Sequence, residues 1–305
     1  MEKIAAPDFD LEMTLNSGQV FHWEQIGDGF AGTIGDLPVY VEQGGNVLKV
    51  RYGETPQPAG GTPTLPGTVA SYFGLDHPLD EICASFPDDS AMNEARDYCR
   101  GLRIIRQPKW ECLATFICSS MKQVAHIRQI SLALRRRLGS VQGPPMLEVF
   151  TFPTPERIAD STEAELRQCA LGYRAKNLLA TARLVVSGEA DLETWSDLND
   201  TDLRARLCEL PGVGAKVANC VMLFAYERLH AFPIDVWIER VLREKYFPRK
   251  RKLSAQTLAA FAANYFGEHG GYAQQYLFHH ARMQRTSLGK KRTKGRVGDL
   301  SPEPA

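Results

Sequence analysis

One lysine in this sequence stands where a side-chain amine can act as a nucleophile. The string Leu210-Pro-Gly-Val-Gly-Ala-Lys216 joins two segments with helical periodicity, so Lys216 falls in the first turn of the second helix. The helix dipole disfavours a positive charge at that end, and burial beside Val217 and Cys220 acts in the same direction. Both effects favour the neutral amine, which is the form that attacks carbon. The alternative interpretation is an ordinary surface lysine.

Two glycines give the turn before this lysine its shape. Gly212 and Gly214 flank Val213, and glycines at these positions let the backbone turn tightly while its N–H groups face one direction. Together with the helix N-terminus, such a turn forms an anion pocket, and a DNA phosphate is the expected guest. A bare Gly-x-Gly is more often a plain turn between helices. The phosphate role therefore depends on the residues that follow.

A carboxylate lies a short distance further along the chain. Asp235 follows Pro233 and precedes a segment whose apolar spacing predicts a helix, so it is well placed as an N-cap. A carboxylate close to Lys216 can also take up a proton and offset positive charge that develops on a substrate. Alone, an aspartate in this context is more often only a cap. Its catalytic role is inferred from its pairing with the lysine.

These strings resemble the helix-hairpin-helix DNA glycosylases and, among them, the 8-oxoguanine DNA glycosylases. The resemblance rests on the residues from Leu210 to Cys220 and from Phe232 to Val236, and it extends from about residue 8 to residue 283. It implies that Lys216 is the nucleophile and that Asp235 is essential. The implied reaction excises 8-oxoguanine from double-stranded DNA through a Schiff base and then cuts the strand by β-elimination, as a glycosylase and abasic-site lyase. It requires no cofactor and no catalytic metal, and the family's hairpin can hold a monovalent cation (K⁺ or Na⁺) on its carbonyls.

The resemblance also assigns a pocket for a base flipped out of the duplex. Cys220 lies one helical turn after Lys216 and forms a wall of this pocket. Gln274 and Phe278, four residues apart on one predicted helix face, bond the base edge and stack on the base. Gly18 offers the carbonyl that accepts the N7–H which 8-oxoguanine has and guanine lacks. Without the resemblance, these residues are a turn glycine, a surface Gln and core side chains.

The sequence departs from the family at the contacts to the opposite base. Met121 stands where the family has an asparagine that fills the gap left by the flipped base, and His126 stands where better-known members use Arg. Tyr173 and Arg174 match the family as a wedge and as the remaining cytosine reader. Trp237 replaces a histidine that contacts the DNA backbone. We therefore expect weak selectivity for the base opposite the lesion.

Two other functions are compatible with the same signals. One is a lysine-bearing glycosylase for another damaged base, and the other is a helix-hairpin-helix module that binds DNA without catalysis. The retained pair of Lys216 and Asp235 argues against the inactive module.

The elements that position these residues change character along the chain. Up to about residue 52, apolar and polar residues alternate in short runs between glycines, which predicts an antiparallel sheet. The expected strands are 9–13, 20–23, 30–34, 38–41 and 47–50, followed by an exposed Pro- and Gly-rich loop over 53–68. Beyond it, apolar residues recur with helical spacing. The expected helices are 79–86, 91–101, 110–123, 126–138, 163–171, 175–187, 202–210, 215–226, 236–246, 255–266 and 272–282.

These elements predict an α+β protein with three parts. Residues 1–88 form a small antiparallel, TBP-like β-rich domain, and residues 89–286 form a mainly α-helical helix-hairpin-helix glycosylase domain. Residues 287–305 are polar and basic and are expected to form a flexible tail.

Composition first argues against a DNA-binding protein, because Lys+Arg and Asp+Glu both number 36 and cancel among 305 residues. Residues 282–296, however, hold seven Lys or Arg and no Asp or Glu, and a second basic group spans 249–252. The zero net charge of the whole chain therefore conceals a local basic surface. The alternative interpretation of the basic run is a solvated tail without a binding role. Seven scattered cysteines offer no metal-binding spacing, and no apolar run is long enough to cross a membrane. We expect a monomeric, intracellular, DNA-associated protein.

Overall fold

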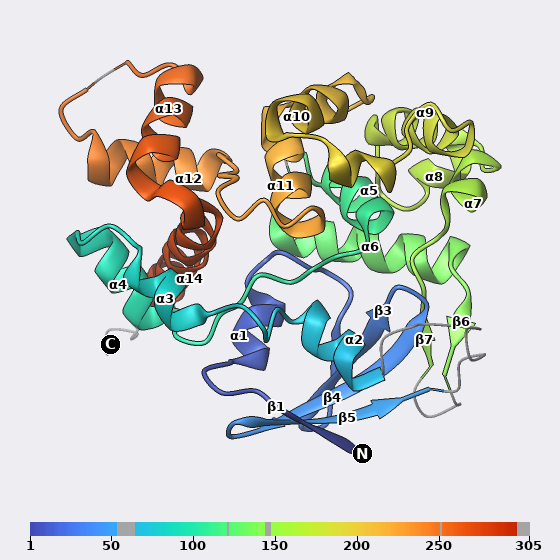
Figure 1. The fold of residues 1–305 in the computed structure, drawn as a ribbon, viewed down its shortest axis with the longest axis horizontal. Coiled ribbons are helices and arrows are strands. Elements are labelled where there is room, and N and C mark those ends of the chain that lie inside the picture. Colours follow the sequence, from blue (N-terminus) through green and yellow to red (C-terminus); the bar gives the residue numbers. More distant parts are fainter. Residues whose placement is uncertain (54–64, 121, 144–147, 251, 298–305) are drawn as a thin grey trace, which may run out of the picture.

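The structure is a computed structural model that describes residues 1–53, 65–120, 122–143, 148–250 and 252–297, with side chains described up to residue 286. A β-rich layer lies on one side and a larger set of helices on the other (Figure 1). The expected α+β architecture is thus confirmed. None of the helices in these ranges is both long and apolar enough to span a membrane.

The N-terminal sheet is antiparallel and has the strand order β1-β5-β4-β3-β2. Alternate residues of its strands face one buried core; in β5, for example, Leu48 and Val50 are fully buried while Lys49 and Arg51 are exposed. The β6–β7 hairpin lies next to β3. The strands are β1 (Glu2–Ala5), β2 (Glu24–Ile26), β3 (Gly29–Ile34), β4 (Leu37–Gly44), β5 (Val47–Tyr52), β6 (Val141–Gln142) and β7 (Val149–Phe150).

Three predictions for this region are wrong or incomplete. Residues 9–13 do not form a strand, because the Asp10 side chain accepts a hydrogen bond from the Met13 N–H (2.8 Å) and caps helix α1 (Leu11–Asn16). Residues 20–23 have no strand partner, and the strand begins at Glu24 instead. Helix α2 (Leu65–Tyr72) starts within the predicted loop, whose residues 54–64 lie outside the described ranges.

The helical part follows the predicted order closely, with three short elements, α7, η1 and η3, in addition. Residues 242–246 form a π-helical turn that continues α12. The helices are α3 (Leu79–Ala84), α4 (Ser90–Tyr98), α5 (Lys109–Ser119), α6 (Val124–Leu138), α7 (Pro155–Ala159), α8 (Glu163–Arg167), α9 (Arg174–Val186), η1 (Thr194–Asp197), α10 (Asp200–Glu209), α11 (Ala215–Ala225), α12 (Val236–Val241), η2 (Leu242–Tyr246), α13 (Ala255–Phe266), η3 (Gly267–His269) and α14 (Gly270–Val297).

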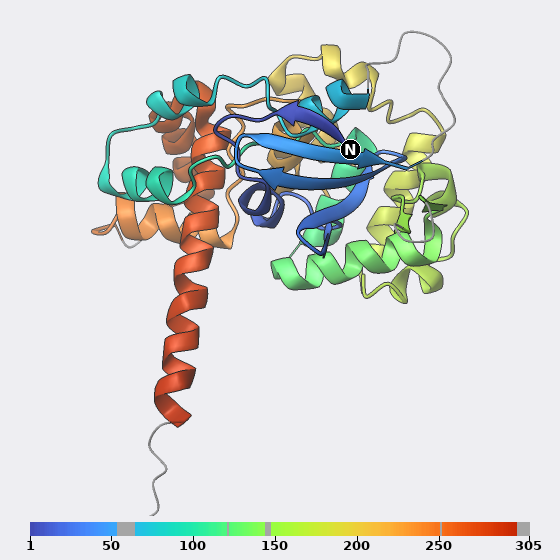
Figure 2. The same ribbon diagram turned by 90° about the horizontal axis from the view of Figure 1, so that it is seen from below.

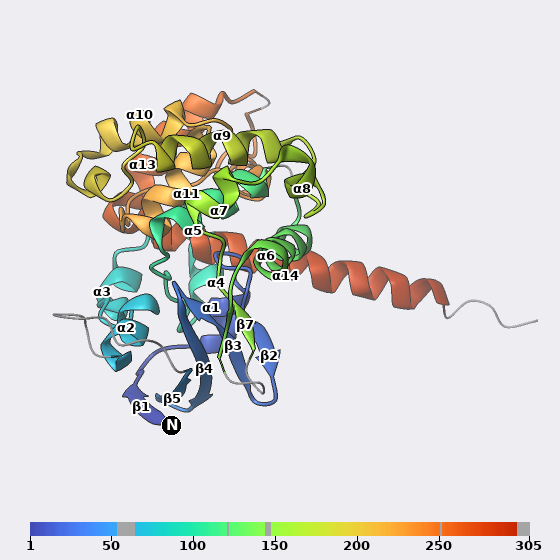
Figure 3. The same cartoon turned by 90° about the vertical axis from the view of Figure 1, so that its right-hand side faces the viewer.

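The last helix differs from its prediction at its C-terminal end. Helix α14 begins inside the helical core and continues through residue 297, past the expected start of the tail at 287, and its end stands away from the body (Figures 2 and 3). Lysine and arginine, which dominate this stretch, are good helix formers. Residues 287–297 are thus helical, which the sequence analysis did not predict, while the flexibility of the tail stays a prediction. Residues 298–305 lie outside the described ranges.

The buried apolar residues form two hydrophobic cores. The smaller core packs the sheet against α1 and α2, and the larger one fills the helical part. Leu79 and Phe86 belong to the helical core although they precede residue 89, and the ring of Phe86 meets that of Tyr276 edge-on at 5.4 Å. The domain boundary at residue 88 stays a prediction.

Candidate active site

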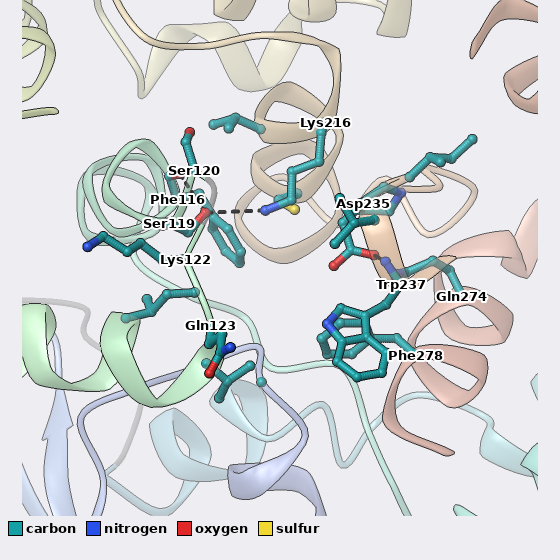
Figure 4. A pocket seen from close by; sticks show the side chains of 18 of the residues that line it. Phe116, Ser119, Ser120, Lys122, Gln123, Lys216, Asp235, Trp237, Gln274 and Phe278 are labelled. Carbon is teal, nitrogen blue, oxygen red and sulfur yellow. Dashed lines mark hydrogen bonds between the residues drawn. The ribbon is translucent and has the colours of Figure 1, made fainter. Parts of the chain in front are cut away.

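A cavity of about 740 Å³ lies where the hairpin, α5, α12 and α14 meet, and Figure 4 shows its side chains. It is lined by eight of the predicted site residues, which come from distant parts of the chain: Gly18, Gly212, Gly214, Lys216, Cys220, Asp235, Gln274 and Phe278. Among its charged lining residues, Lys122, Lys216 and Arg240 are cationic, and Asp235 and Glu239 are acidic. The fold therefore brings the proposed nucleophile, carboxylate and base contacts into one space.

The hairpin is built by a tight turn between α10 and α11. The backbone of Gly212 has a φ of +83°, which favours glycine, and a Cβ there would lie 2.8 Å from the Asn177 amide nitrogen. Val213 buries its side chain in the helical core, and its N–H donates to the Leu210 carbonyl (3.1 Å). The N–H groups in the first turn of α11 have no helix carbonyl one turn earlier to which they could donate. They are therefore the donors available to an anion.

Lys216 reaches into the cavity from the first turn of α11. Its Nζ donates a hydrogen bond to Ser119 Oγ (3.2 Å) and lies 5.0 Å from the centre of the Phe116 ring. Both partners belong to the last turns of α5. Within the described chain, no carboxylate oxygen lies within 4 Å of this amine, and Figure 4 shows it between α5 and Asp235.

Asp235 is the N-cap of α12, as predicted. Its Oδ1 accepts from the N–H groups of Trp237 (3.0 Å) and Ile238 (2.9 Å). Burial raises the pKa of this carboxyl above its ordinary value of 3.8, while the two N–H donors and the Lys216 charge oppose the rise. The Asp235 carboxylate thus caps helix α12 and also lines the cavity.

The predicted base contacts lie on α11 and α14. Burial raises the pKa of the Cys220 thiol to about 11, so this thiol is protonated at neutral pH and forms a neutral wall. Gln274 is 4% exposed, and its Oε1 is buried without a hydrogen-bond partner among the described residues. An unsatisfied buried acceptor is costly, and this one belongs to a residue that lines the cavity. A ligand that donates a hydrogen bond there would satisfy it.

Three of the predicted wedge and opposite-base residues, Tyr173, Arg174 and His126, are not among the residues that line the cavity. Tyr173 is 58% exposed and has the Arg174 guanidinium 4.4 Å from its ring centre, while His126 is exposed in the first turn of α6. Arg174 is buried and donates to the carbonyls of Leu171 (3.3 Å) and Ser120. These bonds support the end of α5, and the role of Arg174 as a cytosine reader stays a prediction. Met121 lies outside the described residues.

Several lining residues were not selected from the sequence. Ser119 and Phe116 contact the lysine from α5, and only the tertiary structure brings them there. Trp237 lines the cavity beside Asp235 (Figure 4), although the sequence indicates only that it replaces a histidine. Arg282, four residues after Phe278 and behind the cavity wall, could have been found from its helical spacing.

An α+β fold with a glycine hairpin, a lysine after it and a capping aspartate in the same cavity defines a helix-hairpin-helix DNA glycosylase. Residues 3–113 match the 8-oxoguanine DNA glycosylase N-terminal domain, and residues 114–264 match the HhH-GPD superfamily of base excision DNA repair proteins. The chain belongs to the 8-oxoguanine DNA glycosylase family.

Individual relatives agree over nearly the whole chain. A protein of Methanothermobacter thermautotrophicus named "Probable N-glycosylase/DNA lyase" is 30% identical and is matched over 92% of this chain and 96% of its own length. An N-glycosylase/DNA lyase of Arabidopsis thaliana is also 30% identical, over 90% of this chain and 78% of that protein. The Clostridium acetobutylicum 8-oxoguanine glycosylase/lyase, solved with double-stranded DNA containing cytosine opposite 8-oxoguanine, is 27% identical with a TM-score of 0.83, covering 93% of this chain and 99% of that one.

Proposed function

We propose that this protein excises 8-oxoguanine from double-stranded DNA and then cleaves the strand at the resulting abasic site. The observation that carries this proposal is the position of the Lys216 amine, the Asp235 carboxylate and the unsatisfied Gln274 Oε1 around one cavity. The family membership and the names of the relatives support the same activity. A DNA-binding module without catalysis would not need the lysine and the aspartate in one cavity.

The chemistry follows from these groups. The neutral amine of Lys216 attacks C1′ of the flipped nucleotide, and the bond to the base breaks with its electron pair going to the base. Asp235 accepts a proton and offsets positive charge on the sugar. The C1′–O4′ bond then breaks, its electron pair and the proton held by Asp235 go to O4′, and a protonated Schiff base forms between Nζ and C1′. The imine acidifies the C2′ proton, whose removal expels the 3′ phosphate.

The base pocket accounts for lesion recognition within this proposal. Gln274 offers an acceptor to the edge of the base, and the Phe278 ring offers a stacking surface. Gly18 lines the same cavity with a φ of +92°. Its carbonyl would accept the N7–H of 8-oxoguanine and would remain unpaired opposite guanine, which disfavours the normal base.

The test is borohydride trapping on a duplex with a single 8-oxoguanine. The wild-type protein should form a covalent adduct, and the Lys216→Gln variant should form none while still binding the duplex. A duplex with guanine at the same position is the control. Absence of an adduct with the wild-type protein would show that the nucleophile is assigned incorrectly.

Selectivity for the opposite base is the finer part of the proposal. His126 is exposed and Arg174 is bound to carbonyls of the protein, so neither is preset to read a cytosine. We expect excision rates opposite the four bases to differ by less than about 10-fold, which is the discrimination of one weakly read base pair. A preference for cytosine of 100-fold or more would contradict this expectation.

A monovalent cation at the hairpin remains part of the proposal. The Leu210 carbonyl accepts from Val213 N–H (3.1 Å) and the Pro211 carbonyl from Thr181 Oγ1 (3.2 Å). Each carbonyl oxygen has two lone pairs, so these oxygens can also face K⁺ or Na⁺, which would add positive charge near a phosphate. We likewise propose a monomer that acts on double-stranded DNA inside the cell.

A further inference from the structure

Arg282 lies directly behind the stacking ring of the base pocket. Its guanidinium carbon is 5.6 Å from the centre of the Phe278 ring, and Phe278 precedes it by one turn of α14. Its Nη2 also donates to the carbonyl of Asn16, in the turn that carries Gly18. One side chain therefore contacts both the ring and the turn.

Among the described residues, no carboxylate balances the charge of Arg282. No Asp or Glu oxygen of the described residues lies within 4 Å of its guanidinium, which is partly buried. Its other polar neighbour is His279 Nδ1, 3.2 Å away. Burial, followed by the Arg282 charge, lowers the pKa of His279 to about 4, so this ring is neutral at pH 7. The guanidinium is thus available to the carbonyl of Asn16 and to the Phe278 ring, where a desolvated cation–π contact is favourable.

The Asn16–Gly18 turn is attached to α14 at two points. Gln275 Nε2 donates to the Ser17 carbonyl (3.1 Å), and Arg282, two helical turns later, donates to the Asn16 carbonyl. Phe278 lies between these donors along the helix. The backbone of Gly18 is close to both neighbours, since a Cβ placed there would lie 3.1 Å from Phe278 Cε1 and 3.0 Å from Arg282 Nη1.

We infer that Arg282 is a positioning residue that fixes the Gly18 carbonyl relative to the Phe278 ring, and thereby sets the discrimination between 8-oxoguanine and guanine. This inference rests on the proposed function. A single backbone acceptor discriminates only if it is held in place, because a hydrogen bond weakens steeply as its angle departs from linear. A glycine turn is intrinsically adaptable. The contact from Arg282 restricts that freedom on the side nearest the ring.

The test measures binding without chemistry, in the Lys216→Gln background. Affinities are measured for three duplexes, which contain 8-oxoguanine, guanine or a stable abasic-site analogue. Adding Arg282→Met should lower the preference for 8-oxoguanine over guanine by about 10-fold, the effect of one hydrogen bond. Affinity for the abasic duplex should stay within 2-fold, because no base occupies the slot. Arg100→Met is the matched control, since it removes the same charge from an exposed position in the turn after α4.

Arg282→Lys serves as a second variant if Arg282→Met unfolds. It keeps the charge, but an ammonium cannot both bond the Asn16 carbonyl and stack on the ring as a planar guanidinium does, so the preference should fall about 3-fold. An unchanged ratio in the folded variant overturns the inference, as does an equal loss on the abasic duplex. If the Lys216→Gln protein itself shows no preference for 8-oxoguanine, the proposed function fails first.

Discussion

Lys216 Nζ donates a hydrogen bond to Ser119 Oγ over 3.2 Å, which links the nucleophile on α11 to the last turn of α5. The Ser119 hydroxyl donates in turn to the Phe116 carbonyl (2.7 Å), so its lone pair is left to accept from the amine. This contact fixes one position of a long, flexible side chain at the edge of the cavity.

Ser119→Ala should therefore slow covalent trapping without weakening DNA binding. Loss of the contact lets the amine occupy positions from which it cannot attack, and misplacement of a reacting group costs about 10-fold or more. Single-turnover borohydride trapping at saturating enzyme measures this effect. A trapping rate equal to that of the wild-type protein would contradict the positioning role of Ser119.

Asp235→Asn separates the charge of this residue from its capping bond. Asparagine also caps helices well, so the variant should keep the fold. Excision should fall by about 100-fold or more, the usual contribution of general acid–base catalysis. In the wild-type protein, activity should fall on the acid side with a midpoint above 3.8, because burial raises the pKa of this carboxyl and protonation removes its charge. The residual activity of the variant should lack this acid limb, and rate profiles from pH 4 to pH 8 would reveal it if it persisted.

Gly212 and Gly214 form a matched pair within the hairpin. An alanine at position 212 must adopt a φ of +83°, and its Cβ would lie 2.8 Å from the Asn177 amide nitrogen. At position 214 the φ is −107°, and a new Cβ would have no neighbouring atom within 4 Å. Gly212→Ala should lower the free energy of unfolding by about 2 kcal/mol, and Gly214→Ala by less than about 1 kcal/mol. Urea denaturation of both variants tests the difference; equal losses would mean that the turn is not constrained at Gly212.

The grouping of these residues around one cavity was predictable because its signals are local. Lys216 and Asp235 stand next to a turn and a cap whose chemistry is written in adjacent residues, and Gln274 and Phe278 share one helix face by their spacing. Ser119 carries no such signal, and the four-residue spacing that places Arg282 on the helix face of Phe278 does not indicate its contact with Asn16. The contact from Ser119 to Lys216 spans 97 positions in the chain, and that from Arg282 to Asn16 spans 266. Their roles depend on how the helices pack.

The errors in the fold also have physical causes. Residues 9–13 alternate apolar and acidic side chains, as residues of a strand do. They form a helix instead because the Asp10 side chain caps the N-terminus of α1. The short strand β1 was missed because it is only four residues long and pairs with β5, more than 40 positions away. The predicted strands 30–34, 38–41 and 47–50 are correct because their apolar residues pack in the core: residues 30–33 are all buried, and 47–50 bury alternate residues.

His279 should make the protein less stable in mild acid. Its folded pKa of about 4 lies below the ordinary value of 6.5, so the unfolded chain binds the proton more tightly. Stability contributed by neutral His279 is therefore complete above pH 6.5 and is lost as the pH falls toward 4. From pH 7 to pH 5 the loss is about 2 kcal/mol. Urea unfolding of His279→Gln should show a smaller pH dependence by that amount, and an unchanged dependence would rule out this source.

The projecting end of α14 should contribute to DNA affinity through charge. After residue 286 this helix carries five Lys or Arg before residue 297 and no acidic residue, and it stands away from the body (Figures 2 and 3). A helix without an apolar face gains little from packing, and its like charges repel unless a polyanion neutralises them.

Each phosphate contact contributes about 0.9 to the slope of log affinity against log salt concentration. Truncation after Thr286 should therefore lower that slope by up to about 4.5, with the single-turnover excision rate at saturating enzyme unchanged. Truncation after Val297 retains the helix and is the control; identical slopes for the two truncated proteins would show that the arm does not contact DNA.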